Sequence, residues 1–203
     1  MPLTRRVLEM RGFCGFVPFS VLSGRLVPSA SGIYVVVRAS DSAPTFLASS
    51  TAGWRKGRDP AVSVTRLTAK WVANAEVLYV GKADSGAAAD HGLRGRLMQY
   101  ARHGSGGTSH HGGRYIWQLH DSAALLVAWK QTIDPRSEER ALLAEFEALY
   151  DTLPFASGID SPVARLDEAR PVTGQSSFGV GVEVLVTVFD CERSRNSALS
   201  LIL

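Results

Sequence analysis

Short runs of apolar residues predict β-strands in four places along the chain. Ser31–Arg38 (SGIYVVVR) and Glu76–Gly81 (EVLYVG) are rich in β-branched or aromatic residues and lie next to Gly or Ser, which is typical of strands. Arg114–Leu119 (RYIWQL) and Ala124–Lys130 (ALLVAWK) predict two further strands. Because only a short polar segment separates this second pair, the two runs also predict a hairpin.

Helical spacing of apolar residues predicts three helices. Leu67 and Trp71 lie four residues apart within Val62–Ala75, and Leu93–His103 also has a helical pattern. A third helix begins near Ser137, where a preceding Asp-Pro pair and two following glutamates suit a helix start, and Pro154 ends it. Its expected apolar stripe consists of Leu142, Phe146, Leu149 and Tyr150.

The order of these elements predicts an α/β (α+β) domain, with a small, mostly antiparallel central sheet flanked by helices. This domain spans residues 1–157 and carries an insert at about 39–75 between the first two strands. Residues 158–203 form a C-terminal extension, in which Val180–Phe189 looks like one more strand. The sequence assigns no role to this extension.

Composition favours a globular protein away from the membrane. Of 203 residues, 45% are hydrophobic, yet no apolar run reaches the roughly 18 residues that cross a bilayer. The first residues lack the apolar segment of a signal peptide. Cys14 and Cys191 form neither a CxxC pair nor a disulfide framework, so we expect a cytoplasmic protein with free thiols.

Positive charge is concentrated in the middle of the chain. Residues 55–114 contain ten Lys/Arg against four Asp/Glu, whereas residues 158–203 contain four against six. A basic segment of this kind suits a polyanion such as DNA or RNA. It is equally compatible with the solvated face of an ordinary protein.

Two predicted helices carry candidate chemistry. Arg96, Tyr100 and His103 share one face of their helix. On the last helix, Glu145 lies beside the apolar stripe, where a carboxylate must be paired or must hold a metal. Glu139 is a weaker candidate because it lies at the helix start, and an ion pair with an arginine is the simple alternative for Glu145.

Other common catalytic patterns are missing from the sequence. The five histidines form no HxxxH or HExxH pattern, and the chain contains no GxSxG, Walker or GxGxxG motif.

Five ordered segments resemble the GIY-YIG nuclease superfamily. The tripeptides at 32–34 (GIY) and 79–81 (YVG) match its paired signature, and the segment LRGRLMQY at 93–100 is similar to its arginine helix. The segment ERALLAE at 139–145 resembles its glutamate helix, and LPFAS at 153–157 stands where the family usually has Pro-x-x-Asn. The flanking segments GFVPF and HHGGRYIWQL look like bacterial stand-alone members, and the long insert is similar to restriction-enzyme-like members. Ser157 departs from the family because it replaces the usual asparagine.

The resemblance implies a divalent-metal-dependent endonuclease that leaves a 5′-phosphate and a 3′-hydroxyl. Glu145 would hold one Mg²⁺ or Mn²⁺, and Tyr34 or Tyr79 would help take a proton from water. Arg96 would stabilise charge on the phosphate. Lys82 would make a nearby tyrosine more acidic. Tyr100 would orient water or a phosphate oxygen.

The implied partner is DNA, with RNA an open alternative. The residues expected to hold the nucleic-acid backbone are Arg55, Lys56, Arg58, Arg102 and His110. With one active site in each chain, double-strand cutting would favour a homodimer. A non-catalytic nucleic-acid-binding module on the same scaffold is the alternative, and Ser157 and the extension are its motivation.

Overall fold

The chain folds around a four-stranded antiparallel sheet. The computed structural model describes residues 1–54, 56–57, 59–84, 92–108 and 113–157. Its strands are β1 (Cys14–Pro18), β2 (Gly32–Val37), β3 (Val77–Ala83) and β4 (Leu126–Gln131). They lie in the order β1-β4-β2-β3, and every neighbouring pair is antiparallel. The expected small antiparallel sheet is therefore confirmed.

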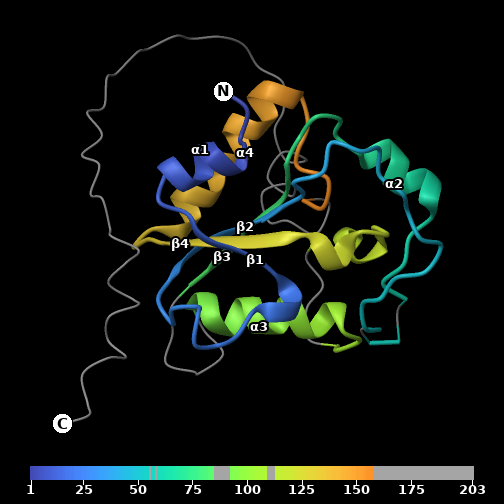
Figure 1. Cartoon of the computed structure of the whole chain (residues 1–203), viewed down its shortest axis with the longest axis horizontal. Coiled ribbons are helices and arrows are strands. Elements are labelled where there is room, and N and C mark those ends of the chain that lie inside the picture. The colour runs from blue at the N-terminus through green and yellow to red at the C-terminus, as the bar shows by residue number, and fades with distance from the viewer. Residues whose placement is uncertain (55, 58, 85–91, 109–112, 158–203) are drawn as a thin grey trace, which may run out of the picture.

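Helices cover both faces of this sheet (Figure 1). The α-helices are α1 (Arg5–Met10), α2 (Val64–Lys70), α3 (Gly92–Gly104) and α4 (Pro135–Tyr150). Short 3₁₀ turns are η1 (Phe19–Val21), η2 (Arg114–Gln118) and η3 (Ser122–Ala124). Helix α3 lies on one face, α1 and α4 lie on the other, and α2 stands beyond the end of the sheet.

Strand β2 is central and joins the two apolar cores. All six of its residues are buried, as expected for a strand covered on both faces. Tyr34 and Val36 pack in the core on the α3 side, whereas the alternating positions, led by Ile33 and Val35, pack with α1 and α4. This alternation sends the tyrosine of the GIY tripeptide toward α3.

Helix α4 begins and ends where the sequence indicates. Asp134 Oδ1 accepts a hydrogen bond from the Ser137 amide at 3.1 Å, and Pro135 occupies the first turn. The helix ends at Tyr150, since Asp151 adopts a left-handed conformation with φ of 54° before Pro154 is reached.

The buried stripe of α4 differs from the predicted one. Its buried residues after the first turn are Glu139, Leu142, Leu143 and Phe146, while Leu149 is 41% exposed. The prediction that Leu149 lies in the stripe was therefore wrong. Tyr150 of the last turn still packs on Phe146, with ring centroids 4.5 Å apart, so the stripe continues through Tyr150 and Leu149 lies outside it.

The predicted strand at Arg114–Leu119 and its hairpin were also wrong. This segment is the 3₁₀ turn η2, closed by hydrogen bonds from the Ile116 amide to the Gly113 carbonyl and from the Leu119 amide to the Ile116 carbonyl. Its residues from Tyr115 to Gln118 are all buried. An apolar run buried on all sides has no alternation to distinguish a strand from a turn of helix.

The N-terminal elements were not predicted. Strand β1 pairs with β4 through a register shift between Gly15 and Val17, and Phe16 within it has a φ of 50°. Helix α1 begins after Thr4, whose side chain accepts a hydrogen bond from the Val7 amide at 3.4 Å. A bulged strand of five residues and a helix of six give little periodic signal.

Part of the predicted organisation lies outside the described residues. This applies to the 158–203 extension and to the strand expected at Val180–Phe189. Among the described helices, none has the length and apolar character needed to cross a membrane.

The corrected stripe of α4 can be tested by a matched pair of truncations. Phe146 is fully buried, so we expect Phe146→Ala to lower the free energy of unfolding by about 3–5 kcal/mol. Leu149→Ala should change it by about 0.5 kcal/mol or less, as for an exposed position. Urea denaturation measures both values, and a similar loss in the two variants would contradict this packing.

Candidate active site

Three tyrosines from three different elements meet on the α3 face of the sheet. Tyr34 comes from β2, Tyr79 from β3 and Tyr100 from α3. Their ring centroids lie 5.9 Å apart for Tyr34 and Tyr79, 6.2 Å for Tyr34 and Tyr100, and 5.6 Å for Tyr79 and Tyr100. Tyr34 and Tyr100 are fully buried, whereas Tyr79 is partly buried. The structure thus brings together three residues that the sequence singled out.

Two glycines leave room for these rings. A Cβ on Gly81 would lie 2.6 Å from Tyr34 Cζ and 2.7 Å from its hydroxyl oxygen. Gly113 has a φ of 72°, and its carbonyl accepts a hydrogen bond from the Tyr100 hydroxyl at 2.9 Å. The glycine of the 79–81 tripeptide is therefore needed for the close approach of the Tyr34 ring.

Arg96 provides the positive charge beside the tyrosines. It lies on α3, one turn before Tyr100. Burial alone would lower the pKa of Arg96, but the neighbouring tyrosine hydroxyls, chiefly that of Tyr34, outweigh it and raise the pKa. The guanidinium therefore stays charged where it faces the tyrosines.

All three phenols of the cluster have raised pKa values. Burial raises the pKa of Tyr34, and Arg96 and the Tyr79 hydroxyl partly oppose this shift. Burial raises the pKa values of Tyr79 and Tyr100 well above the ordinary value. The Tyr34 hydroxyl is buried and has no well-formed hydrogen bond to a described residue. The Arg96 guanidinium and the Tyr79 hydroxyl nevertheless lie near enough to lower its pKa, so these two groups are its polar surroundings.

Glu139 is the carboxylate that the structure places near the tyrosines. Its charge adds to the raised pKa values of both Tyr34 and Tyr79. It comes from α4, on the opposite face of the sheet, and reaches Lys82 of β3 with a Nζ–Oε2 distance of 2.6 Å. Because β3 is an edge strand, groups from the two faces can approach each other around this edge.

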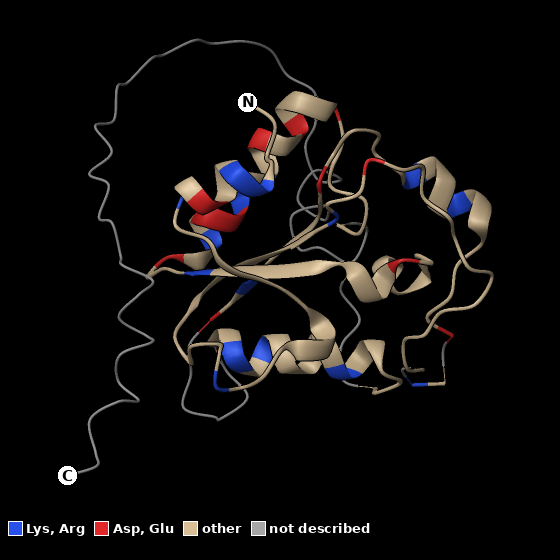
Figure 2. Ribbon diagram, in the orientation of Figure 1, with Lys and Arg blue, Asp and Glu red and all other residues tan. Residues whose placement is uncertain are grey.

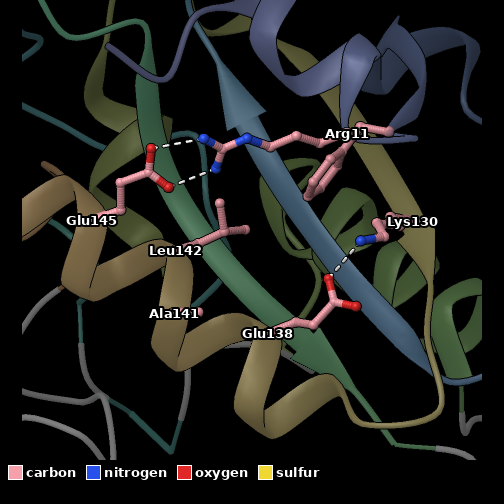
Figure 3. A pocket seen from close by; sticks show the side chains of 7 residues that line it. Arg11, Lys130, Glu138, Ala141, Leu142 and Glu145 are labelled. Atoms are coloured by element: carbon pink, nitrogen blue, oxygen red, sulfur yellow. Dashed lines mark hydrogen bonds and ion pairs between the residues drawn. The ribbon is translucent and has the colours of Figure 1, made fainter. Parts of the chain in front are cut away.

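Glu145, the sequence's first choice for the metal, does not join this cluster. Its two carboxylate oxygens accept hydrogen bonds from Arg11 Nη1 and Nη2 at 2.6 and 2.7 Å (Figure 3). The hydrogen bond from Arg11 lowers the pKa of Glu145, and no tyrosine contributes to that shift. Glu145 therefore forms the ion pair with an arginine that the sequence left open as its alternative role.

The hollow beside Glu145 is a weak candidate for a binding site. It has a volume of about 130 Å³. A second ion pair, from Lys130 Nζ to Glu138 Oε2 at 2.8 Å, lies across Leu142 from the first (Figure 3). Since the cations and carboxylates of its wall are already paired with one another, little charge is left for a ligand.

Helix geometry explains why Glu139 is buried although the helix start was expected to be exposed. Seven residues separate it from Phe146, so at 100° per residue the two side chains lie about 20° apart around the helix. Phe146 is fully buried, and Glu139 shares its face. Placing the stripe on Leu142, Leu143 and Phe146 would have identified Glu139 as the buried carboxylate, with an exposed fraction of 9%.

The site offers one carboxylate oxygen to a cation. Lys82 bonds Glu139 Oε2, and Oε1 has no hydrogen bond within the described part of the chain. Carboxylate oxygens suit Mg²⁺ or Mn²⁺. The described residues contain no group of three His, Cys, Asp or Glu that could hold a metal. These residues therefore fit a cation held by one glutamate, with other ligands from water and phosphate.

The remaining sequence candidates lie at different places. Lys56 and Arg102 are exposed, whereas Arg55, Arg58 and His110 lie outside the described residues.

Ser157 is buried at the end of a segment that is bound to β3. The Ala156 amide donates a hydrogen bond to the Leu78 carbonyl at 2.8 Å. The hydroxyl of Ser157 has no hydrogen-bond partner among the residues that the structure describes.

A comparison with protein-family models, curated proteins and solved structures finds no match to this chain.

The tight contact at Gly81 gives a prediction about the site. Gly81→Ala would push a methyl group into the Tyr34 ring, so we expect a loss of about 1–3 kcal/mol in the free energy of unfolding. Gly57→Ala is the control for glycine replacement elsewhere; its added Cβ meets nothing within 4 Å, although its φ of 70° causes backbone strain. Tyr34→Phe combined with Gly81→Ala should recover part of the loss. No recovery in denaturation experiments would mean that the hydroxyl is not the obstacle.

The buried tyrosines also predict a loss of stability in alkali. Their pKa values are raised on folding, so the unfolded chain releases its tyrosine protons near pH 10 while the folded chain retains them. Their contribution is therefore complete below about pH 10 and is lost as the pH rises further. Urea denaturation at pH 9 and pH 11 should show a smaller decrease for Tyr100→Phe than for wild type. Equal decreases would contradict the raised pKa of Tyr100.

Proposed function

We propose that this chain is a divalent-metal-dependent endonuclease of the GIY-YIG type, which hydrolyses DNA phosphodiester bonds to 5′-phosphate and 3′-hydroxyl ends. The observation that carries the proposal is the meeting of Tyr34, Tyr79 and Tyr100 beside Arg96, with Glu139 near enough to affect two of the phenols. Phenol oxygens, a fixed guanidinium and a carboxylate are the groups that phosphodiester hydrolysis needs.

The chemistry of each residue follows from its surroundings. Tyr34 would accept the proton of the attacking water, since Arg96 and the Tyr79 hydroxyl favour its ionised form. Its pKa nevertheless lies above the ordinary value, so it needs additional positive charge before it can act as a base at neutral pH. A divalent cation held by Glu139 would supply that charge and polarise the phosphate.

Arg96 and Tyr100 would act on the phosphate and the water. The Arg96 guanidinium would stabilise negative charge that builds up on the phosphate oxygens in the transition state. Tyr100 donates its proton to the Gly113 carbonyl. We therefore assign Tyr100 to orienting water, because a hydroxyl already used as a donor is poorly suited to a phosphate oxygen.

Lys82 would position Glu139 in this scheme. Its ammonium group holds one carboxylate oxygen at 2.6 Å and leaves the other open. Because a lysine and a divalent cation compete for the same negative charge, the cation would bind through the open oxygen. Cleavage of both DNA strands would then need two copies of the chain or two successive cuts.

The decisive experiment compares two glutamates on the same helix. Plasmid DNA is incubated with Mg²⁺ or Mn²⁺ and with wild type, Glu139→Gln or Glu145→Gln. We expect wild type to nick the plasmid, Glu139→Gln to lower the rate at least about 100-fold, and Glu145→Gln to remain within about threefold. Thermal unfolding of each variant measures any loss of folded protein, for which the rates are corrected.

Each other result has a clear meaning. Loss of cutting in Glu145→Gln alone would mean that Glu145, the residue first chosen from the sequence, holds the metal. Equal cutting by all three proteins would remove the carboxylate from the mechanism.

A non-catalytic nucleic-acid-binding module is the second candidate function. It is favoured by the pairing of both glutamates, Glu139 with Lys82 and Glu145 with Arg11, which leaves Arg96 as the charged group beside the tyrosines. This function predicts salt-sensitive DNA binding by wild type without any cutting. Binding should then be unchanged in Glu139→Gln.

A further inference from the structure

Trp54 differs from the other tryptophans of the chain because it is exposed. Its exposed fraction is 58%, against 5% for Trp117 and 4% for Trp129. Trp71 is partly buried and packs on Phe155, with ring centroids 5.2 Å apart. Exposing an indole ring to water is unfavourable in free energy, because the ring has a large apolar surface. A single exposed aromatic residue is not unusual, so the backbone that carries Trp54 matters.

The backbone before Trp54 is fixed to the end of α3. The Gly53 amide donates a hydrogen bond to the His103 carbonyl at 2.9 Å, and the Thr51 amide donates to the Trp117 carbonyl at 3.2 Å. Ala52 between them is buried. A Cβ on Gly53 would collide with the carbonyls of Gly106 and Gly107. Trp54 is therefore held out into solvent by an anchored chain, which lowers the entropy that a ligand must remove.

The surface around Trp54 is basic. Helix α3 contains Arg94, Arg96 and Arg102 and no acidic residue (Figure 2). Arg102 is exposed on the last turn, next to the point where Gly53 is attached. Lys56 is exposed two residues after Trp54. The nearby carboxylate of Asp59 accepts a hydrogen bond from the Ala61 amide at 2.8 Å.

An aromatic ring among cations favours nucleic acid over a protein partner. Among the described residues from 43 to 63 and on the last two turns of α3, Trp54 is the only large exposed apolar side chain. The exposed cations Lys56 and Arg102 beside this ring suit a polyanion. Stacking of a base on one aromatic ring, with phosphates held by nearby Lys and Arg, is the general mode of single-strand binding.

We propose that Trp54 stacks on an unpaired base of a nucleic-acid strand that runs along α3. The proposal rests on the proposed function and specifies its substrate as a single strand or a locally unpaired duplex. Seven residues separate Arg96 from His103, which is about 10 Å along the helix axis. The strand would pass from Trp54, held at the last turn of α3, toward Arg96 about two turns earlier.

Binding to matched single-stranded and duplex oligonucleotides tests the proposal. A labelled strand of 20 nucleotides, alone or paired, is titrated with wild type, Trp54→Ala, Trp54→Phe and Ile133→Ala in EDTA, so that no strand is cut. We expect Trp54→Ala to weaken single-strand binding at least about fivefold and duplex binding less than twofold. Trp54→Phe should retain most of the affinity, and Ile133→Ala, which removes an even more exposed apolar side chain from the loop before α4, should have no effect.

Tryptophan fluorescence gives an independent readout. Unlabelled single strand should quench part of the emission of wild type, and this quenching should be absent in Trp54→Phe. Equal weakening on both DNAs, or no weakening at all, would overturn the stacking proposal. A change of oligomeric state in Trp54→Ala without a change in DNA binding would instead make this surface an interface between two copies.

The outcome is separate from that of the cleavage experiment. If wild type does not cut DNA but Trp54→Ala loses single-strand binding, the stacking site stands and the endonuclease does not. If wild type cuts and Trp54→Ala binds normally, only the stacking site fails.

Discussion

The contact between the Tyr34 ring and the backbone of Gly81 is the constraint on which the candidate site depends. Two neighbouring strands place these residues opposite each other, and a side chain at 81 would occupy the space of the phenol. Tyr79 and Tyr100 then close around Tyr34 from β3 and α3. Because the three rings touch, the position of each phenol depends on the packing of the other two.

Burial makes these phenols poor bases when the protein is alone. The apolar surroundings disfavour the tyrosinate form, and Arg96 opposes that effect only in part. The same surroundings strengthen any electrostatic interaction with a charge that enters the site. In the proposed function, a cation and a phosphate would therefore change the acidity of Tyr34 much more than they would in open solvent, and proton transfer would be confined to the bound complex.

The sequence predicted the elements with strong periodicity and failed where burial or short length removed it. The strands of Tyr34 and Tyr79 and the helix of Arg96 were predicted close to their observed bounds. The turn at Arg114–Gln118 was mistaken for a strand because the buried residues of that run show no alternation. Glu139 was underrated because helix ends are usually exposed, and only the packing of α4 against the sheet determines which of its faces is covered.

The start of α3 is bound to the segment that leads into β2. The amides of Leu93 and Arg94 donate to the carbonyls of Ala30 and Pro28, and the Arg94 side chain donates to the Val27 carbonyl at 2.8 Å. A shift of the helix would therefore pull on the strand that begins two residues later. The guanidinium and the phenol are thus set at a fixed mutual position during folding, and in the proposed function substrate binding need not supply the free energy to bring them together.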